Sequence, residues 1–418
     1  MLSARVNFAA LVLAVVSFES VAAIKLARFV SEQEPFAGQA CFGAVVEMHQ
    51  GIPVAIANLG NRDPRFCQPQ SVTVEPQLIA DALLTDPQFD DLIVEPILAD
   101  ARSSRILPPI AYSQQQLDER QRLVIGVGFN YREHLEETGD YSGSGPLLLF
   151  AKPVLPTGPY QSVRTGAATD VLLDYEVELA MVLLEDIDLN APPRPQQLYP
   201  SVAFALANDL SDRVPIILNP DSGYTQGKSD PGFMPLGPWL RLGREGFADE
   251  QGNWQIDANI SLGVTKAKSG EYILEQDASL MQMRFDPYQI IQVMATRYQE
   301  GKNQCMRDRH GNAHWVLPTD GIVPAGSILL TGTAGGTAIQ APSIWQKIGL
   351  FFEGGFSIDN ARKEFLEDQF VGRERLGYLQ DGDFVSANIQ GLGQQAFAIE
   401  LDSNQPVTQG PLPLPDCD

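Results

Sequence analysis

Acidic side chains alternate along one strand-like segment, and their spacing could hold a metal ion. In residues 171–184 every odd-numbered residue is apolar or aromatic, whereas the even-numbered ones begin with Asp174, Glu176 and Glu178. Alternate side chains of a strand share a face, so one face would pack into the core and the other would carry the acids. Two unpaired carboxylates about 4 Å apart repel by roughly 4 kcal/mol at an effective dielectric near 20. A hard divalent cation would remove this repulsion, because it prefers carboxylate oxygens.

A further acid, Asp209, follows the apolar run of residues 202–207. The end of a buried strand is a usual place for a metal ligand, although a helix N-cap is equally common there. A solvated acidic face on an edge strand is the other interpretation of the acids. The far end of residues 171–184 is too apolar for an exposed strand, which favours the metal site.

Two other patterns match known sites only by their letters. Residues 391–396 fit a dinucleotide fingerprint, but an apolar strand-like run follows where a helix is needed. His310 and His314 have the spacing of zinc ligands on a helix, but Gly311 and Asn312 between them indicate a loop. The sequence contains no Walker loop and no Gly-x-Ser-x-Gly motif.

Seven motifs, taken in chain order, resemble those of the fumarylacetoacetate hydrolase family. They are residues 126–134 with the Asn-Tyr-x-x-His segment, 150–153 (Phe-Ala-Lys-Pro), 174–180 (Asp-Tyr-Glu-Val-Glu-Leu-Ala), 208–213, 227–229 with 235–239, 331–333 (Thr-Gly-Thr), and 381–383 before 391–393. The resemblance covers about residues 120 to 400, and its strength lies in the order of the motifs.

The resemblance implies a mainly β fold of the α+β class. It consists of a C-terminal β-roll of mixed sheets with a metal at one mouth, in a protein that is usually a homodimer. The resemblance assigns Glu176, Glu178 and Asp209 as the metal ligands. Carboxylate oxygens suit Mg²⁺, and also Mn²⁺ or Ca²⁺.

Three further residues match the catalytic groups of the family. His134 and Glu137 match its water-activating pair; they are three residues apart, so on a short helix they share a face and can hydrogen-bond. The carboxylate would then orient the imidazole. Lys228 matches the lysine that stabilises a developing oxyanion. Without these motifs, the histidine and the lysine would be read as ordinary surface residues.

Residues that would contact the substrate are less well defined. The resemblance implies this role for Tyr131, Lys152, Arg213 and Thr333. The segment after Asp209 departs from the family pattern, because Val214 and Ile216 stand where an acid and an amide are usual; residues 229–233 and 334–337 also differ. These departures leave the metal ligands intact and make the substrate uncertain.

The activity implied is a divalent-metal-dependent hydrolysis of a carbon–carbon bond in a β-diketo acid, such as an acylpyruvate or a fumarylacetoacetate-like compound. A metal-dependent decarboxylase, isomerase or hydratase of oxo acids would use the same site. A non-catalytic exported binding protein on this fold is a third interpretation.

The sequence predicts that the chain is divided into three regions. Residues 1–23 resemble a secretory signal peptide, with Arg5, an apolar run and small residues before the cleavage point; an uncleaved anchor or a buried helix is the alternative. Residues 24–110 would form a small β domain with a helix near residues 76–84, and residues 111–418 the catalytic domain, with an insertion near 338–377. That insertion contains an apolar face, which would pack in the core or against a dimer partner, or else cover the site or touch a membrane. Its members are Ile344, Trp345, Ile348, Leu350, Phe351 and Phe352.

Four cysteines, an even number in an exported chain, predict disulfide bonds, although free thiols remain the alternative. Three pairings are possible. We expect Cys41 to pair with Cys67, since both fall in the first domain, and Cys305 would then pair with Cys417. Both pairs suit a periplasmic or secreted protein.

The charge of the chain also limits its partners. With 52 acidic against 29 basic residues, the net charge is −23. Such a field repels phosphate backbones, so we expect a small oxo-acid substrate and no nucleic acid. No later segment is apolar enough for a stable membrane span in the mature chain.

Overall fold

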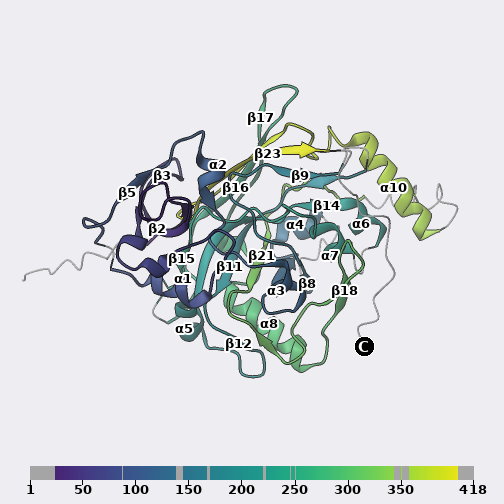
Figure 1. Ribbon diagram of the computed structural model, residues 1–418. Helices are drawn as coiled ribbons and strands as arrows, with labels where there is room; N and C mark the ends of the chain where they lie inside the picture. The colour runs from purple at the N-terminus through teal and green to yellow at the C-terminus, as the bar shows by residue number, and fades with distance from the viewer. Residues whose placement is uncertain are drawn as a thin grey trace, which may run out of the picture.

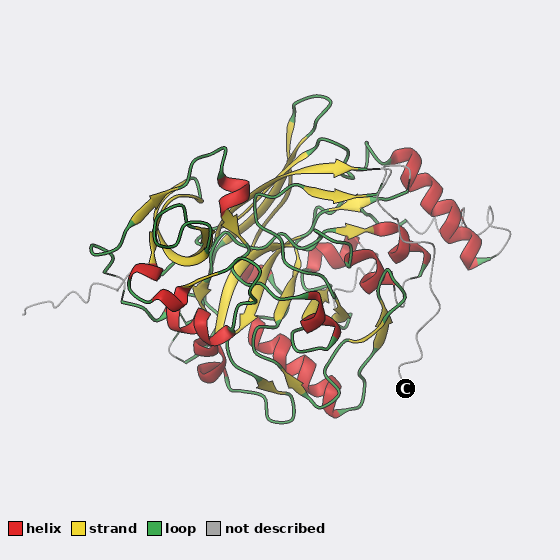
Figure 2. Cartoon of the chain, viewed as in Figure 1, coloured by secondary structure: helices red, strands yellow, loops and turns green. Residues whose placement is uncertain are grey.

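The computed structural model describes residues 24–402 except 87, 138–144, 167–169, 220–222, 245, 250, 343–349 and 351–356. β-Strands form the centre of the molecule and helices lie around them (Figure 1). Figure 2 shows the same arrangement, with helices of different lengths around the strands. The mainly β, α+β architecture that the sequence predicts is confirmed.

A six-stranded central sheet carries the acid-bearing segments. Its order is β15 (Arg241–Leu242), β13 (Val202–Asn208), β11 (Val177–Leu183), β21 (Ile328–Thr333), β7 (Val124–Gly128) and β8 (Leu148–Ala151). Only β21 and β7 run parallel in this sheet. Every residue of β11 and β13 is buried, as their long apolar runs predict.

A five-stranded sheet packs against one face of the central sheet. Its order is β17 (Tyr272–Ser279), β16 (Asn259–Thr265), β22 (Phe384–Ile389), β23 (Gly393–Leu401) and β9 (Val163–Thr165). Leu179 and Met181 of β11 share one core with Leu262 of β16 and with Ile290 of helix α8 (Pro287–Gln299). The odd-numbered face of β11 is therefore the core face that the alternation predicts.

The N-terminal part of the chain covers the other face of β11. Its sheet consists of β5 (Val94–Pro96), β3 (Ile52–Asn58), β2 (Ala40–His49), β1 (Leu26–Val30) and β6 (Ile106–Leu107), with β4 (Cys67–Gln68) paired to β2. Leu26 and Phe42 pack in one cluster with Ala180 and Val182. The even-numbered face of β11 is thus buried beyond the acids, so the strand is not a solvated edge. The boundary near residue 110 stays a prediction.

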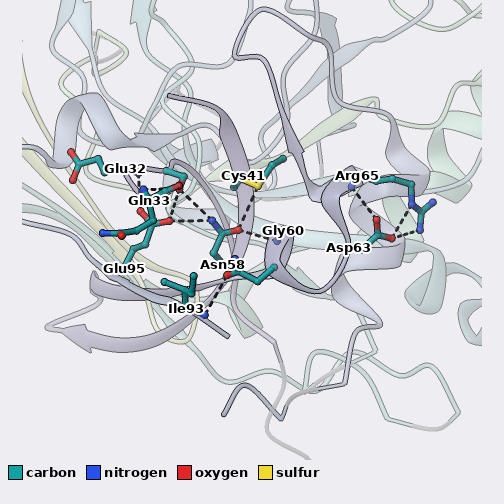
Figure 3. The surroundings of a disulfide bond; sticks show 12 residues. Glu32, Gln33, Cys41, Asn58, Gly60, Asp63, Arg65, Ile93 and Glu95 are labelled. Carbon is teal, nitrogen blue, oxygen red and sulfur yellow. Dashed lines mark hydrogen bonds and ion pairs between the residues drawn. A yellow bond between two sulfur atoms is a disulfide. The ribbon is translucent and has the colours of Figure 1, made fainter. Parts of the chain in front are cut away.

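A disulfide bond joins Cys41 of β2 to Cys67 of β4, which confirms the expected pairing (Figure 3). Beside it lies Glu95, a buried carboxylate that pairs with Arg105 at 2.8 Å. Cys305 is also disulfide-bonded, whereas Cys417 lies outside the described residues, as does the predicted signal peptide of residues 1–23.

The remaining elements are helices and two-stranded pairs. The helices are α1 (Pro76–Leu83), α2 (Arg102–Arg105), α3 (Gln114–Asp118), α4 (Arg132–Glu137), α5 (Pro195–Leu198), α6 (Arg213–Leu218), α7 (Gly223–Lys228) and α10 (Ile358–Gly372), with 3₁₀ turns at Leu59–Asn61, Pro64–Phe66, Tyr199–Ser201 and Leu280–Gln282. Three strand pairs stand apart: β10 (Leu173–Asp174) with β14 (Ser211–Asp212), β12 (Ile187–Asp188) with β20 (Ile322–Val323), and β18 (Cys305–Arg307) with β19 (Ala313–Trp315). The helix predicted near residues 76–84 is α1.

Two further expectations concern apolar segments. Among the described residues, no helix has the length and apolarity to cross a membrane. Of the apolar face predicted in the 338–377 insertion, Leu350 is buried, and the other members lie outside the described residues. His314 lies in β19 and its imidazole bonds Asp308 at 3.0 Å, so it is held within a hairpin.

Candidate functional site

The antiparallel ladder opens at the point where the acids lie. β10 pairs with β14, and β11 pairs with β13, in one continuous register. Between these two pairings, Tyr175 and Glu176 on one strand lie opposite Asp209 and Leu210 on the other. The Asp209 amide donates across the opening to the Glu176 carbonyl oxygen at 2.8 Å.

At this opening, side-chain oxygens accept the hydrogen bonds of backbone amides in place of carbonyl oxygens of a neighbouring strand. The consecutive amides of residues 175–177 donate to Asp174, Asn208 and Gln276 at 2.8, 3.2 and 3.0 Å. All three acceptor side chains are buried. Buried backbone amides need such partners, so the opening is a fixed feature of the fold rather than a frayed strand end.

The opening brings the three predicted metal ligands together. Glu176, Glu178 and Asp209 are all buried, and one oxygen from each lies within 4.8 Å of the others. Their spacing in the chain differs, yet the paired strands place them in one group. A buried Glu–Glu–Asp group of this size could bind a divalent cation.

Two lysines already contact this group. Lys228 Nζ lies 2.7 Å from Glu176 Oε2 and 2.7 Å from Asp209 Oδ2. Lys152 Nζ lies 2.6 Å from Asp209 Oδ1 and also donates to the Lys228 carbonyl oxygen at 2.6 Å. Both lysines are buried, so their charges are balanced mainly by these carboxylates.

Arg213 supplies the third positive charge. Its Nη2 lies 2.5 Å from Glu176 Oε1, and its Nε lies 2.8 Å from Asp174 Oδ2. Four buried carboxylates thus face three lysine and arginine side chains, which leaves one negative charge unbalanced. Among the described residues, Glu178 is the carboxylate of this group without an ion pair to a lysine or arginine.

The pKa values separate the two glutamates accordingly. Burial raises the pKa of Glu176, but Lys228, Arg213 and His134 together lower it to about 2. For Glu178, burial and then the charges of Asp209 and Glu176 hold the pKa well above its usual range. Glu178 therefore binds a proton more readily than an exposed glutamate does.

The surroundings of Glu178 fit a bound divalent cation. Its Oε2 accepts a hydrogen bond from the Gly332 amide at 2.7 Å, at a bulge of β21 where Gly332 has φ +93°. Its Oε1 is buried and has no hydrogen-bond partner among the described residues. A buried unsatisfied oxygen is costly, and a cation that prefers hard oxygen ligands would satisfy it.

The predicted histidine–glutamate pair lies on α4, beside the carboxylates. His134 is buried, and its Nδ1 lies 3.4 Å from Glu137 Oε2. Glu137 Oε1 accepts from the Gly336 amide at 2.6 Å. His134 is also one of the charges that lower the pKa of Glu176, so it acts electrostatically on that ligand.

The four residues expected to contact a substrate have different surroundings. Tyr131 is buried near Glu178, and its hydroxyl has no hydrogen-bond partner among the described residues. Thr333 Oγ1 bonds the Val177 carbonyl oxygen at 2.9 Å. Lys152 and Arg213 direct their charges at the carboxylates. A substrate role for these four residues stays a prediction.

The sequence did not single out the residues that shape the opening. Asp174 appears in the acidic row, but nothing in the alternation separates it from the metal ligands. Asn208 and Gln276 are ordinary polar residues in the sequence. Gln276 comes from β17, about 100 residues further along the chain, and bonds Val177, Thr333 and Ala334. Only the packing of the two sheets reveals this contact.

Comparison with known proteins agrees with this arrangement. The model of the fumarylacetoacetate (FAA) hydrolase C-terminal family matches residues 123–400, which include every site residue described above. A curated relative, the 2,4-didehydro-3-deoxy-L-rhamnonate hydrolase of Sphingomonas sp. (strain SKA58), is 26% identical over 151 residues, or 35% of this chain and 49% of that protein. The chain spans between 46% and 65% of the length of the curated relatives it matches.

Solved structures share the fold. The fumarylacetoacetate hydrolase of psychrophilic Exiguobacterium antarcticum is 21% identical with a TM-score of 0.56, and the match covers 91% of this chain and 100% of that one. The 2-hydroxyhepta-2,4-diene-1,7-dioate isomerase of Mycobacterium marinum is 17% identical with a TM-score of 0.51, at the same coverage.

Proposed function

The chain belongs to the fumarylacetoacetate hydrolase family, and we propose that it is a divalent-metal-dependent hydrolase that cleaves a carbon–carbon bond in a β-diketo acid such as an acylpyruvate. One observation carries the proposal: a buried Glu–Glu–Asp group with an unsatisfied carboxylate oxygen lies beside a histidine–glutamate pair. Mg²⁺ is the ion we propose, with Mn²⁺ or Ca²⁺ as substitutes.

Glu176, Glu178 and Asp209 would hold the cation. Once bound, it would supply Lewis-acid stabilisation of the negative charge that develops on the 2-oxo acid part of the substrate. By holding the ion, the three carboxylates would also set where the 2-oxo acid part of the substrate binds.

His134 would act as the general base. Its Nδ1 is turned to Glu137 Oε2, so Nε2 is the nitrogen available to take a proton from water. The water then attacks the distal carbonyl carbon. Glu137 holds the ring in place and stabilises the imidazolium that forms. Cleavage of the carbon–carbon bond releases a carboxylic acid and the enolate of a 2-oxo acid, which takes up a proton.

Lys228 would stabilise the oxyanion of the attacked carbonyl. Burial lowers the pKa of Lys228, but Asp209 and Glu176 outweigh that effect and raise it, so the side chain stays positively charged. A permanent cation at this position suits the stabilisation of an oxyanion better than proton transfer.

The proposal is tested by the ultraviolet absorbance of acylpyruvates. We expect the purified protein to cause a loss of this absorbance. EDTA should abolish the activity, and added Mg²⁺ should restore it. Glu178→Gln should lower the rate at least about 100-fold, because one metal ligand is lost. The control is Glu185→Gln, which changes an exposed glutamate just beyond the same strand and should behave as the wild type.

The products decide the type of reaction. A carboxylic acid and a 2-oxo acid in equal amounts support hydrolysis. Loss of CO₂, or a product with the carbon skeleton of the substrate, would contradict hydrolysis and indicate a decarboxylase, isomerase or hydratase at the same site. Metal and ligand binding without turnover would favour a binding protein.

We further propose that the protein is exported to the periplasm or secreted. The Cys41–Cys67 disulfide supports this proposal, because such bonds persist in oxidising compartments. Mass spectrometry of the protein from its native cells should find a chain that begins at residue 24. A chain that retains Met1 would contradict the proposal. The homodimer implied by the family resemblance stays a prediction.

A further inference from the structure

Asp174 is not one of the predicted metal ligands, yet its carboxylate is densely hydrogen-bonded. The side chain is completely buried and accepts four hydrogen bonds. Its Oδ1 accepts from the amides of Tyr175 at 2.8 Å and Ala338 at 2.9 Å. Its Oδ2 accepts from the Ile339 amide at 3.1 Å and from Arg213 Nε at 2.8 Å. Both carboxylate oxygens are therefore fully used.

The contact of Asp174 with Arg213 connects it to the metal ligand Glu176. The bond to Arg213 Nε fixes the guanidinium, and Nη2 of the same group contacts Glu176 Oε1 at 2.5 Å. The plane of the guanidinium therefore sets the orientation of the Glu176 carboxylate. Partners of this kind orient metal ligands and affect metal affinity strongly.

The contacts of Asp174 with the amides of Ala338 and Ile339 connect it to the histidine–glutamate pair. Ala338 and Ile339 belong to the segment 334–341, which follows β21. The same segment holds Glu137: the Gly336 amide donates to Glu137 Oε1 at 2.6 Å, and the Ala341 amide donates to the Glu137 carbonyl oxygen at 2.7 Å. Asp174 thus fixes one side of a segment whose other side fixes Glu137.

We propose that Asp174 is a positioning residue that couples the geometry of the metal ligands to that of the His134–Glu137 pair. The coupling runs through Arg213 to Glu176 and through residues 334–341 to Glu137. This inference rests on the proposed function, because it assigns to Asp174 a role in that reaction. Asp174 itself would not touch the substrate.

The test variant is Asp174→Asn, which keeps the size of the side chain. Whichever way the amide is turned, its NH₂ group faces two of the four donors, so one pair of hydrogen bonds is lost. We expect kcat at saturating Mg²⁺ to fall about 10- to 100-fold, and Mn²⁺ to bind about tenfold more weakly. The KM should change much less than kcat, because the substrate contacts are not altered.

The matched control is Asp212→Asn. Asp212 is also buried and precedes Arg213, but a single oxygen accepts from the amides of Leu172 and Val214 at 3.1 and 3.0 Å. Asparagine can keep both bonds, so this variant should retain the kcat and the Mn²⁺ affinity of the wild type. The melting temperature of Asp212→Asn shows how much stability is lost when a buried carboxylate outside the proposed coupling is removed from this region.

A double-mutant cycle with Glu137→Gln separates positioning from simple destabilisation. If Asp174 acts on Glu137 through residues 334–341, its substitution should lower kcat clearly less once Glu137 is already replaced, since coupled residues are not additive. Only the loss that runs through Arg213 to Glu176 should then remain. An equal loss of kcat in both backgrounds, or a lower melting temperature with unchanged kcat, would overturn the proposal.

Hydrogen–deuterium exchange gives a readout that does not depend on turnover. In Asp174→Asn, the amides of residues 334–341 and of α4 should exchange faster than in Asp212→Asn. If the wild type turned over no oxo acid, the proposed reaction would fail, while faster exchange and weaker Mn²⁺ binding would still support the coupling. Unchanged exchange together with unchanged Mn²⁺ affinity would refute it.

Discussion

At the scale of residues, the central feature is the buried carboxylate of Glu178. Lysine and arginine side chains pair with Asp174, Glu176 and Asp209, whereas Glu178 accepts from the Gly332 amide, and its Oε1 has no hydrogen-bond partner in the part of the chain that the structure describes. A protein would gain nothing in stability from such a group. Its presence is explained if a divalent ion occupies the cluster during function.

The pKa of Glu178 leads to a prediction for the metal-free protein. Burial, Asp209 and Glu176 raise this pKa in the folded state above the usual 4.5. The folded chain then binds more protons than the unfolded chain, so stability should fall as the pH rises above about 4.5. Melting temperatures measured in EDTA from about pH 5 to about pH 8 should fall more steeply for the wild type than for Glu178→Gln.

Saturating Mg²⁺ should remove this difference in slope for the wild type, because the ion replaces the proton on Glu178. Parallel slopes in EDTA for the wild type and Glu178→Gln would contradict the environment described for Glu178. The comparison between the two proteins cancels the general effect of the net charge of −23.

The histidine–glutamate pair leads to a second prediction at this scale. His134→Gln should lower kcat about 10²- to 10⁴-fold, the usual contribution of a general base. It should leave Mn²⁺ affinity within about threefold of the wild type, because His134 is not a proposed ligand. Steady-state rates and electron paramagnetic resonance of Mn²⁺ measure the two effects. Loss of metal binding with unchanged kcat would reverse the assignment.

The sequence predicted the individual residues of the site better than their contacts. The alternation of residues 171–184 indicated the acids, and the motif order indicated His134, Glu137 and Lys228. That Lys152 and Arg213 would neutralise the carboxylates could not be predicted, because a long cationic side chain reaches many positions. Only the fold decides which of these it takes.

At the scale of elements, the opened ladder and the segment 334–341 create the site. Two strands with uninterrupted pairing would leave Glu176 and Asp209 among ladder contacts. Here, the opening is stabilised by Asp174, Asn208 and Gln276. The sequence predicted both strands but not the opening, because the pattern of apolar residues is continuous across it.

Gly336 offers a test of the segment 334–341. It has φ +99°, and a Cβ built there would lie 1.9 Å from the Glu275 carbonyl oxygen. Gly336→Ala should displace the amide that holds Glu137 and so lower kcat by about tenfold or more, while the metal ligands stay in place. Rates and Mn²⁺ binding test this expectation.

Gly270→Ala is the matched control for this substitution. Gly270 has a similar positive φ of +70°, but an added Cβ meets nothing within 4 Å. It therefore shows the effect of backbone strain alone. If both variants lost the same activity, the position of Glu137 would not depend on the contact at Gly336.

At the scale of the whole molecule, the N-terminal sheet completes the burial of the site strands. Its residues cover the even-numbered face of β11, which would otherwise expose Ala180 and Val182. The sequence predicted the β structure of this region and its disulfide, since the chain alternates apolar runs with turns there. It could not predict which face of the central sheet the region would cover.

Removal of the Cys41–Cys67 bond tests whether the N-terminal sheet stabilises the protein without taking part in catalysis. The two cysteines are 26 residues apart, and the loss of such a cross-link should destabilise the protein by about 3 kcal/mol. The double variant Cys41→Ala, Cys67→Ala should still reach the wild-type kcat at low temperature. Chemical denaturation and rates measure the two quantities. A large loss of kcat in the folded variant would contradict a purely stabilising role.

The central claim is that the three carboxylates form a divalent metal site, and anomalous diffraction from crystals soaked in Mn²⁺ tests it most directly. We predict one Mn²⁺ per chain, about 2.2 Å from oxygens of Glu176, Glu178 and Asp209, and no such peak in Glu178→Gln. A wild-type crystal with no Mn²⁺ among these carboxylates, or with the ion bound elsewhere, would contradict the claim.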